Sequence, residues 1–194
     1  MKKINDDFEY HKYLKTHSFK SNIYKKYFLH KFLIKYSGND FLDIGCGLGS
    51  FLKLGSEKAL GLDINEHNIN YIINKGLKAK LIPKNGIFPL KEKSYQSIVC
   101  DQVLEHIQDP TLFLSEINRV IKSPGQLILG LPLEKGYKAD QDHRSFYKPR
   151  KAIRLIESNT RLIHQKTIYY PLPLEIFGKI FRQQFFYLLF KTFD

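Results

Sequence analysis

Apolar positions are arranged differently in successive parts of the chain. Between residues 8 and 36, aromatic and aliphatic side chains lie among lysines, with a helical period that is clearest from Ile23 onward. This stretch predicts one or two amphipathic helices. A turn signal at residues 37–40, Ser-Gly-Asn-Asp, separates it from the next part of the chain.

From residue 41 onward, short apolar runs alternate with segments of helical spacing. We expect strands at 41–44, 59–64, 78–82, 97–101, 126–131 and 162–169. We expect helices after the glycines at 45–49, at 66–74, from 109–110 to about 122, and from 149 to about 157. Asp109 is placed to cap the third helix with Pro110 at its first position, and Pro124-Gly125 should end it.

This alternation predicts an α/β fold. We expect a Rossmann-like, doubly wound, mostly parallel sheet with helices on both faces and an N-terminal helical extension. Residues 1–37 would form an N-terminal helical cap and residues 38–170 the Rossmann-like domain. Residues 171–194 would belong to the same domain or form a membrane or dimer surface.

The last segment has two interpretations. Between residues 174 and 189 its apolar side chains lie broadly at helical spacing, namely Leu174, Phe177, Ile180, Phe181, Phe185, Leu188 and Leu189. Residues 183–193 fit the closing strand of the sheet equally well. Periodicity does not decide between helix and strand here.

The charge of the chain is concentrated at its two ends. The 194 residues, 43% of them hydrophobic, suffice for one compact domain and carry a formal net charge of +12. Residues 1–38 contribute +6, residues 39–143 contribute −1 and residues 144–194 contribute +7. The basic flanks could meet an anionic membrane surface, nucleic acid or an acidic substrate.

The cysteine content and the length of the apolar runs indicate in which cellular compartment the protein resides. Cys46 and Cys100 lie in apolar surroundings without CxxC spacing or a pair of histidines, so neither a zinc site nor a disulfide framework is expected. The first residues lack the apolar run of a secretory signal, and the longest apolar run, residues 185–190, is too short to span a bilayer. We expect a cytoplasmic protein, with a peripheral position at the inner membrane surface as an open alternative.

A glycine loop follows the first expected strand of the alternation. Gly45, Gly47 and Gly49 let the backbone turn sharply and approach a ligand closely. Asp63 closes the next strand, where a carboxylate can accept both hydroxyls of a ribose. A tight turn without a ligand would leave the two acids, Asp43 and Asp63, unexplained.

Two nucleotide-like cofactors fit this pattern, a dinucleotide and S-adenosylmethionine. The third glycine comes one residue earlier than in a dinucleotide-binding loop. Asp43 lies two residues before the first glycine, which suits an α-amino group better than a pyrophosphate. The pattern therefore favours S-adenosylmethionine.

Several ordered motifs resemble a known family. Residues 41–49, Phe-Leu-Asp-Ile-Gly-Cys-Gly-Leu-Gly, look like motif I of the class I S-adenosylmethionine-dependent methyltransferases, and residues 61–64 look like motif II. Residues 103–110 are similar to the stretch after the fourth strand in the small-molecule branch, methyltransferase type 11, which includes quinone and sugar methyltransferases. Residues 123–127 resemble its fifth-strand entry and residues 142–149 its substrate-side loop.

The resemblance covers about residues 38–158 and implies S-adenosyl-L-methionine as the cofactor. It places Asp43 near the methionine amino group, the glycine loop around the methionine and ribose, Asp63 on the ribose hydroxyls and Gln102 beside the cofactor. The implied cofactor-binding set is Asp43, Gly45, Cys46, Gly47, Gly49, Asp63, Ile64 and Gln102.

Two departures from the family pattern change the expected site. The acid that many relatives use for adenine is replaced by residues 83–86, Pro-Lys-Asn-Gly, so adenine would be held by backbone, by Asn85, or less tightly. Quinone methyltransferases of this branch can carry Glu-x-x-Glu-His as a metal site, and here Gln102 takes the first position. One carboxylate and one histidine make a poor magnesium site, so we predict no required metal.

Two histidines are candidates for a general base, which helps when the methyl acceptor is a hydroxyl. His143 comes first, because its loop after the fifth strand should overhang the strand ends; alternatively it orders the loop by contacting Asp142 or Tyr147. His106 comes second, and alternatively bonds backbone or packs beside Glu105.

These observations together predict a methyltransferase acting on a small molecule. The expected acceptor is an oxygen of a sugar, glycolipid or quinone-like compound, including a lipid-linked one. A non-catalytic binding protein of the same fold and an RNA-directed methyltransferase using the basic flanks are the alternatives. Residues 101–104, Asp-Gln-Val-Leu, stand where base-methylating enzymes carry their signature, which counts against nucleic acid as the acceptor.

Overall fold

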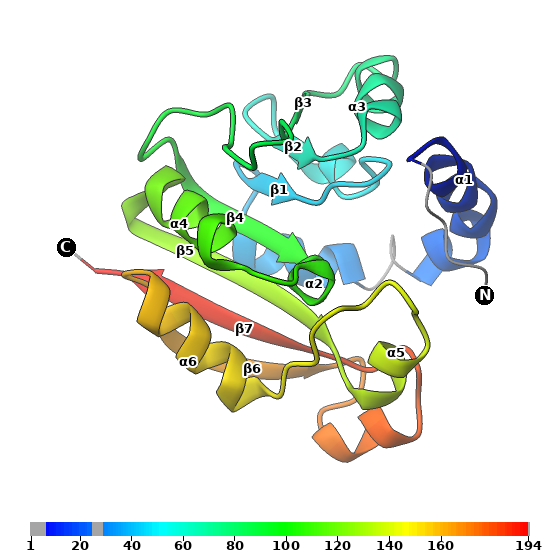
Figure 1. The fold of residues 1–194 in the computed structure, drawn as a ribbon, viewed down its shortest axis with the longest axis vertical. Helices are drawn as coiled ribbons and strands as arrows, with labels where there is room; N and C mark the ends of the chain where they lie inside the picture. Colours follow the sequence, from blue (N-terminus) through cyan, green and yellow to red (C-terminus); the bar gives the residue numbers. More distant parts are fainter. Residues whose placement is uncertain (1–6, 25–28, 194) are drawn as a thin grey trace.

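A seven-stranded sheet forms the centre of the computed structural model, which describes residues 7–24 and 29–193 (Figure 1). The strand order is β3-β2-β1-β4-β5-β7-β6. Strand β7 runs antiparallel to β5 and β6, and the other neighbouring pairs are parallel. The strands are β1 (Leu42–Ile44), β2 (Leu60–Asp63), β3 (Ala79–Leu81), β4 (Tyr95–Asp101), β5 (Ile121–Pro132), β6 (Ile163–Tyr170) and β7 (Phe185–Thr192).

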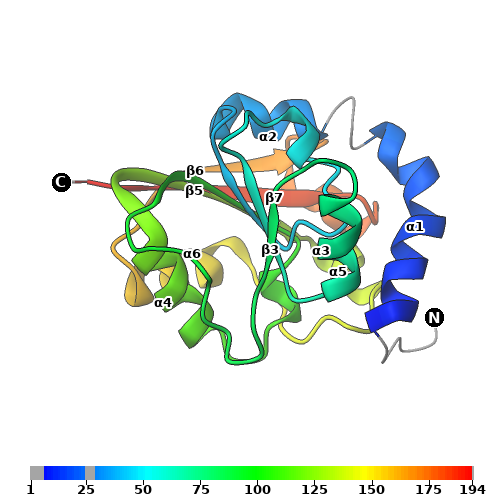
Figure 2. The ribbon, with the colours of Figure 1, turned by 90° about the horizontal axis from the view of Figure 1, so that it is seen from above.

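Helices cover both faces of this sheet. The α-helices are α1 (Asp7–Tyr24), α2 (His30–Ser37), α3 (Glu66–Ile73), α4 (Thr111–Val120), α5 (Glu134–Lys138) and α6 (Pro149–Asn159). The short 3-10 helices are η2 (Leu52–Leu54), η3 (Leu104–His106) and η4 (Glu175–Lys179). Figure 2 shows α2 on one side of the sheet and α4 and α6 on the other. The expected doubly wound, mostly parallel α/β fold is confirmed.

Two apolar clusters hold these layers together, one on each face. The larger contains Leu114 of α4 and Ile156 of α6 packed on the β4 and β5 side chains. The other joins Leu33 of α2 and Ile72 of α3 to Phe41 before β1. Burying such aliphatic and aromatic side chains supplies the main favourable term in folding.

The helix expected after the glycine loop is replaced by the three-residue η2. Gly49 and Gly55 bound this stretch and leave five residues between them, of which three form a single 3-10 turn. The N–H of Gly55 donates to the carbonyl of Leu52 and closes the turn at 3.0 Å. The expected helix at this place is therefore wrong.

Helix α4 begins later and ends earlier than expected. Asp109 Oδ1 accepts a hydrogen bond from the backbone N–H of Thr111 at 3.0 Å, while Pro110 takes the N-cap position rather than the first helical one. The helix ends at Val120, and β5 starts at the next residue, so Pro124-Gly125 lies within the strand. A register shift between Tyr95 and Ser97 of β4 accommodates this irregular pairing.

The C-terminal segment shows which of its two interpretations holds. Residues 185–192 form β7, which is inserted between β5 and β6. The closing strand is therefore the correct interpretation, and the helical spacing of the apolar residues beyond 181 does not correspond to a helix. Phe186, Tyr187 and Leu188 are all fully buried. A strand in the sheet interior is covered on both faces, so its sequence is continuously apolar and shows no alternation.

The carboxyl ends of the parallel strands meet at one edge of the molecule. In Figure 1 the arrowhead of β4 points to the right, toward α1 and α5. The carboxyl end of β6 leads into η4 on the same edge. Ligands bind at this edge in open α/β sheets. None of the helices in the described parts of the chain has both the length and the apolar character needed to cross a bilayer.

Candidate functional site

Asp63 joins the end of β2 to the glycine loop after β1. Its Oδ2 accepts the backbone N–H of Gly47 at 2.8 Å and its Oδ1 accepts that of Asn65 at 2.8 Å. Burial raises the pKa of the Asp63 carboxyl, and the N–H donors of Asn65 and Gly47 oppose that rise. The structure thus brings together the acid and the loop that the sequence singled out.

The loop glycines have backbone angles that other residues rarely adopt. Gly45 has φ +75°, and a Cβ there would lie 2.2 Å from Cγ2 of Val103, so only glycine allows this close approach. Gly47 has φ +54°, and its Cβ position meets only Cδ1 of Leu14 at 4.0 Å. Open space therefore lies at the Cα of Gly47, the residue whose backbone N–H Asp63 accepts. Gly49, the third loop glycine, faces Ile72 of α3.

The other residues predicted around the loop differ in exposure. Asp43 is buried in β1, where it pairs with Gly61 and Val99 on the flanking strands. Cys46 is also buried, with its Sγ 2.5 Å from where a Cβ of Gly61 would be, and burial raises the pKa of its thiol. Ile64 is 73% exposed, directly after Asp63.

Gln102 carries backbone strain and an unsatisfied amide at the end of β4. Its φ is +59°, although it is not a glycine. Its N–H donates to the carbonyl of Gly130 at 3.0 Å, but its buried Nε2 has no hydrogen-bond partner among the described residues. Strain and orphaned polar atoms of this kind concentrate at ligand sites.

A second cluster lies at the carboxyl end of β4 and contains Glu105, His106 and His143. The rings of His106 and His143 meet edge to face, with centroids 4.7 Å apart. His143 Nε2 lies 3.9 Å from Oε1 of Glu105. The N–H groups of Arg144 and Ser145 donate to the Glu105 carbonyl at 2.7 and 3.0 Å, which fixes the loop over η3. The structure thus brings together both predicted histidines.

Glu105 is the residue of this cluster that the sequence argument did not single out as functional. It is 1% exposed, and neither carboxyl oxygen has a hydrogen-bond partner among the described residues. Burial raises its pKa to about 8, with a smaller contribution from the negative charges of Asp101 and Asp140. An acid with a pKa perturbed in this way marks functional sites. The available signal was the Glu-x-x-Glu-His pattern, of which Glu105 and His106 keep the last two positions.

The two histidines have defined tautomers. Nδ1 of His143 lies 2.8 Å from the carbonyl of Tyr137, and Nδ1 of His106 lies 3.3 Å from that of Asp142. A carbonyl only accepts, so Nδ1 carries the proton in each neutral ring and Nε2 keeps a free electron pair. Tyr137 also stacks on His143, with centroids 5.2 Å apart. The backbone bond proposed for His106 is present, and the loop-ordering partner of His143 is Tyr137.

The same three side chains have the spacing of a metal site. One ligand atom from each of Glu105, His106 and His143 can be chosen so that all lie within 4.8 Å of one another. Burial, and to a lesser extent His143, lowers the pKa of His106, which keeps this imidazole neutral. The expectation that no metal is required stays a prediction.

The loop expected near adenine offers little side-chain chemistry. The Asn85 Oδ1 accepts the backbone N–H of Ile87 at 3.1 Å, and both residues are exposed. The amide nitrogen of Asn85 would therefore be the group left for a ligand. The way in which adenine is held stays a prediction.

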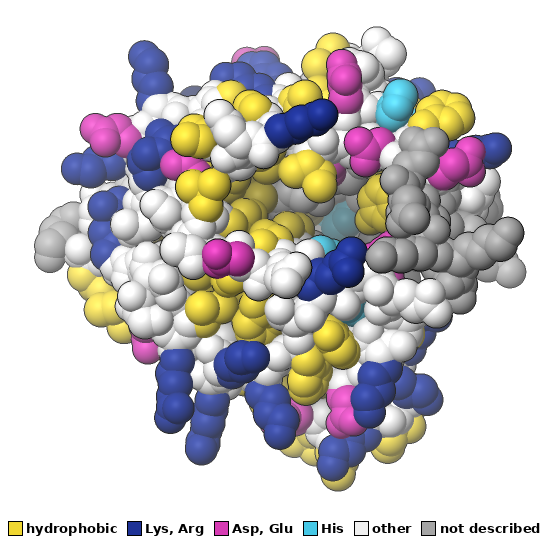
Figure 3. Space-filling view, viewed as in Figure 1, with side chains coloured by type: hydrophobic (Ala, Val, Ile, Leu, Met, Phe, Trp, Pro, Cys, Tyr) yellow, Lys and Arg dark blue, Asp and Glu magenta, His cyan; other side chains and the backbone are white. Residues whose placement is uncertain are grey.

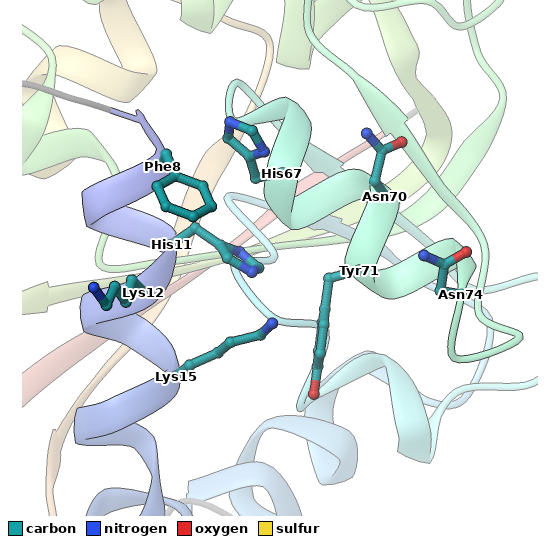
Figure 4. A pocket seen from close by; sticks show the side chains of 8 residues that line it. All are labelled: Phe8, His11, Lys12, Lys15, His67, Asn70, Tyr71 and Asn74. Carbon is teal, nitrogen blue, oxygen red and sulfur yellow. The ribbon is translucent and has the colours of Figure 1, made fainter.

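A separate groove lies between α1 and α3 (Figure 4). Nζ of Lys15 lies 4.7 Å from the centre of the Tyr71 ring, and Nδ1 of His11 bonds Oδ1 of Asn68 at 2.8 Å. None of the predicted site residues lines it. The lining residues are Phe8, His11, Lys12, Lys15, His67, Asn70, Tyr71 and Asn74.

Comparisons with known proteins find similarity to one family with this architecture. Residues 42–129 match the family described as a methyltransferase domain. The chain is 30% identical over 100 residues to a protein of Mycolicibacterium smegmatis named a probable S-adenosylmethionine-dependent methyltransferase, covering 50% of this chain and 39% of that protein. It is 26% identical over 147 residues to the ubiquinone biosynthesis O-methyltransferase of Aliivibrio fischeri, covering 62% of each.

Solved structures show the same fold. A crystal structure of a SAM dependent methyltransferase from Archaeoglobus fulgidus superposes with a TM-score of 0.70 at 20% identity, covering 93% of this chain and 99% of that one. The chain spans less than two thirds of the length of the curated relatives that it matches first.

Proposed function

We propose that the chain is a class I S-adenosylmethionine-dependent methyltransferase, as its similarity to that family supports, and that it transfers a methyl group from S-adenosyl-L-methionine to an oxygen of a small-molecule acceptor. The acceptor class is a sugar, a glycolipid or a quinone-like compound. The observation that carries this proposal is the buried Asp63 carboxylate bonded to Gly47 of the glycine loop.

The residues at the ends of β1, β2 and β4 fit the donor. A carboxylate has about four acceptor positions, and Asp63 uses two of them on backbone N–H groups. We propose that its remaining acceptor capacity takes ribose hydroxyls, beside the open space at Gly47. The exposed Ile64 offers an apolar face for a flat ring, and the unpaired Nε2 of Gln102 offers a donor. We assign Asp43, Gly45, Cys46 and Gly49 to the same pocket, as lining.

The donor supplies a methyl group on a sulfonium, an activated leaving group, so the protein's main task is to position an acceptor oxygen. In this proposal Nε2 of His143 takes the proton from the acceptor hydroxyl, because its tautomer leaves that nitrogen free. Oε1 of Glu105 lies 3.9 Å from this nitrogen, so this carboxyl borders the position where the proton is received. His106 is the second candidate for the base.

Two observations support a small, partly apolar acceptor. The side chains beside His143 are aromatic, with Tyr137 stacked on it and the Phe146 ring centroid 5.0 Å from that of Tyr137. The relative from Aliivibrio fischeri is named for ubiquinone biosynthesis. A cytoplasmic location, with lipid-linked acceptors reached at the inner membrane surface, belongs to the same proposal.

A transfer assay tests the proposal. The purified protein is incubated with donor labelled on the methyl group and with catechols, sugars, glycolipids in vesicles, and RNA. Label should appear on the oxygen of a hydroxyl-bearing small molecule and not on RNA. Donor binding without any transfer would support a non-catalytic binding protein, and label confined to RNA would support the RNA-directed alternative. Either result contradicts the proposed acceptor.

A further inference from the structure

Four large apolar side chains are exposed on the connection from β6 to β7. Leu174, Ile176, Ile180 and Phe181 are between 48% and 59% exposed and lie within eight residues of one another. We call these four residues the η4 surface, after the 3-10 helix that contains Ile176 and is flanked by the other three. Soluble proteins rarely keep so many neighbouring apolar side chains in water without a partner for them.

The η4 surface is held in place by specific contacts. Gly178 is buried against α5, and a Cβ there would lie 2.3 Å from Cβ of Leu133. Nζ of Lys135 donates to the carbonyl of Ile180 at 2.7 Å. Because η4 packs against α5 on one side, the four residues of the η4 surface are exposed on the other side.

Basic residues surround this surface. Lys135, Lys138, Lys179 and Arg182 are exposed on α5 and on or just after η4. Two acids lie nearby: Glu134 pairs with Lys138, and Glu175, which keeps its charge, accepts the hydroxyl of Tyr169 at 3.0 Å. In Figure 3 hydrophobic side chains reach the surface at the lower right, around the position of η4 in Figure 1, with Lys and Arg beside them.

The η4 surface adjoins the acceptor side of the candidate site through α5. Tyr137 of this helix stacks on His143, while Lys135, two residues earlier, bonds the backbone of Ile180. Any partner that contacts the η4 surface therefore also lies near His143, the candidate base.

We propose that the η4 surface docks on an anionic lipid bilayer and thereby brings lipid-linked acceptors to His143; the acceptor half of this inference rests on the proposed function. Apolar side chains rimmed by cations are the chemistry that binds such an interface, because the side chains enter the headgroup region and the cations meet lipid phosphates. The net charge of +7 on residues 144–194 adds to this attraction.

Vesicle co-sedimentation of the full chain tests the docking. The vesicles contain phosphatidylcholine alone or phosphatidylcholine with phosphatidylglycerol. The wild type should bind the anionic vesicles, and binding should weaken at high salt. The double variant Ile176→Ser with Phe181→Ser should bind about tenfold more weakly, because it removes two of the inserted side chains.

Matched variants control for a general loss of apolar surface or charge. Ile73→Ser makes the same change at a residue that is 51% exposed at the end of α3, away from the η4 surface, and should bind as the wild type does. Lys179→Gln should reduce binding to anionic vesicles about fivefold without changing the behaviour on neutral ones.

Three results would overturn the docking proposal. They are no binding of the wild type to anionic vesicles, equal binding by the wild type and the double variant, or a wild-type dimer in light scattering that the double variant abolishes without any vesicle binding. The last would assign the surface to a second copy of the chain. Calorimetry with S-adenosylmethionine separates the two proposals, since a protein that binds vesicles but not the donor contradicts only the proposed function.

Discussion

Single residues carry the chemistry of the site, and they differ in how far the sequence reveals them. Asp63 and Gly47 were predictable, because a strand-end acid and a glycine loop imply a shared ligand, and they are bonded at 2.8 Å. Glu105 and Tyr137 were not, because their roles arise from contacts with His143 across 38 and 6 positions of the chain. Such contacts are set by the packing of loops, which local sequence patterns do not encode.

Replacing His143 tests its role as the general base. His143→Ala should lower kcat by about 10²-fold to 10⁴-fold, the usual contribution of a positioned base. The dissociation constant for S-adenosylmethionine should stay unchanged, because the donor residues lie at the ends of β1 and β2. Steady-state kinetics and calorimetry give the two quantities. A turnover equal to that of the wild type would transfer the role to His106, for which His106→Ala is the matched variant.

Glu105 should make stability depend on pH. Burial raises its pKa to about 8, above the value near 4.3 of an unfolded chain. The folded state therefore holds this proton more tightly, and the resulting stabilisation is complete below about pH 4.3 and is lost as pH rises through about 8. Glu105→Gln should lack this loss. Denaturant unfolding at a series of pH values measures it, and parallel pH profiles for the two proteins would contradict the buried, protonated carboxyl.

At the scale of elements, regular patterns were predicted well and interrupted ones poorly. Helices α3 and α6 were foreseen to within two residues, because their apolar positions recur at helical spacing. The two misplaced elements lie beside glycine or proline: η2 follows Gly49, and β5 begins three residues before Pro124. Glycine and proline indicate that the chain changes direction, but tertiary packing decides which kind of element follows. β7 was left open because a strand covered on both faces shows no alternation.

Substitutions in the C-terminal segment distinguish its two parts. Leu188 is fully buried in β7, so Leu188→Ala should cost about 2 to 5 kcal/mol in the free energy of unfolding. Leu174→Ala, at a residue 57% exposed, should change it by less than about 0.5 kcal/mol. Urea denaturation gives both values. Similar costs at the two positions would mean that the exposed segment is packed in solution.

At the scale of the whole molecule, the sheet order gathers separate stretches of sequence at one edge. Strands β1, β2 and β4 end side by side, so the glycine loop, Asp63 and Gln102 come from three strands that are neighbours in the sheet or separated by one. The loop before α6 adds His143, and η4 extends the same edge. The proposed donor residues, the candidate base and the η4 surface thus occupy adjoining positions, as the proposal of an acceptor held at a membrane requires.

The central claim is that Asp63 and the glycine loop bind S-adenosylmethionine, and isothermal titration calorimetry tests it most directly. The wild type should bind S-adenosylmethionine and S-adenosylhomocysteine and remain silent toward NAD. Asp63→Ala should weaken both adenosyl ligands by about 10²-fold, since charge-assisted hydrogen bonds to the ribose are lost. Asp40→Ala removes an exposed acid elsewhere and should bind as the wild type does. Equal affinity in the wild type and Asp63→Ala, or binding of NAD in place of the adenosyl ligands, would contradict the account.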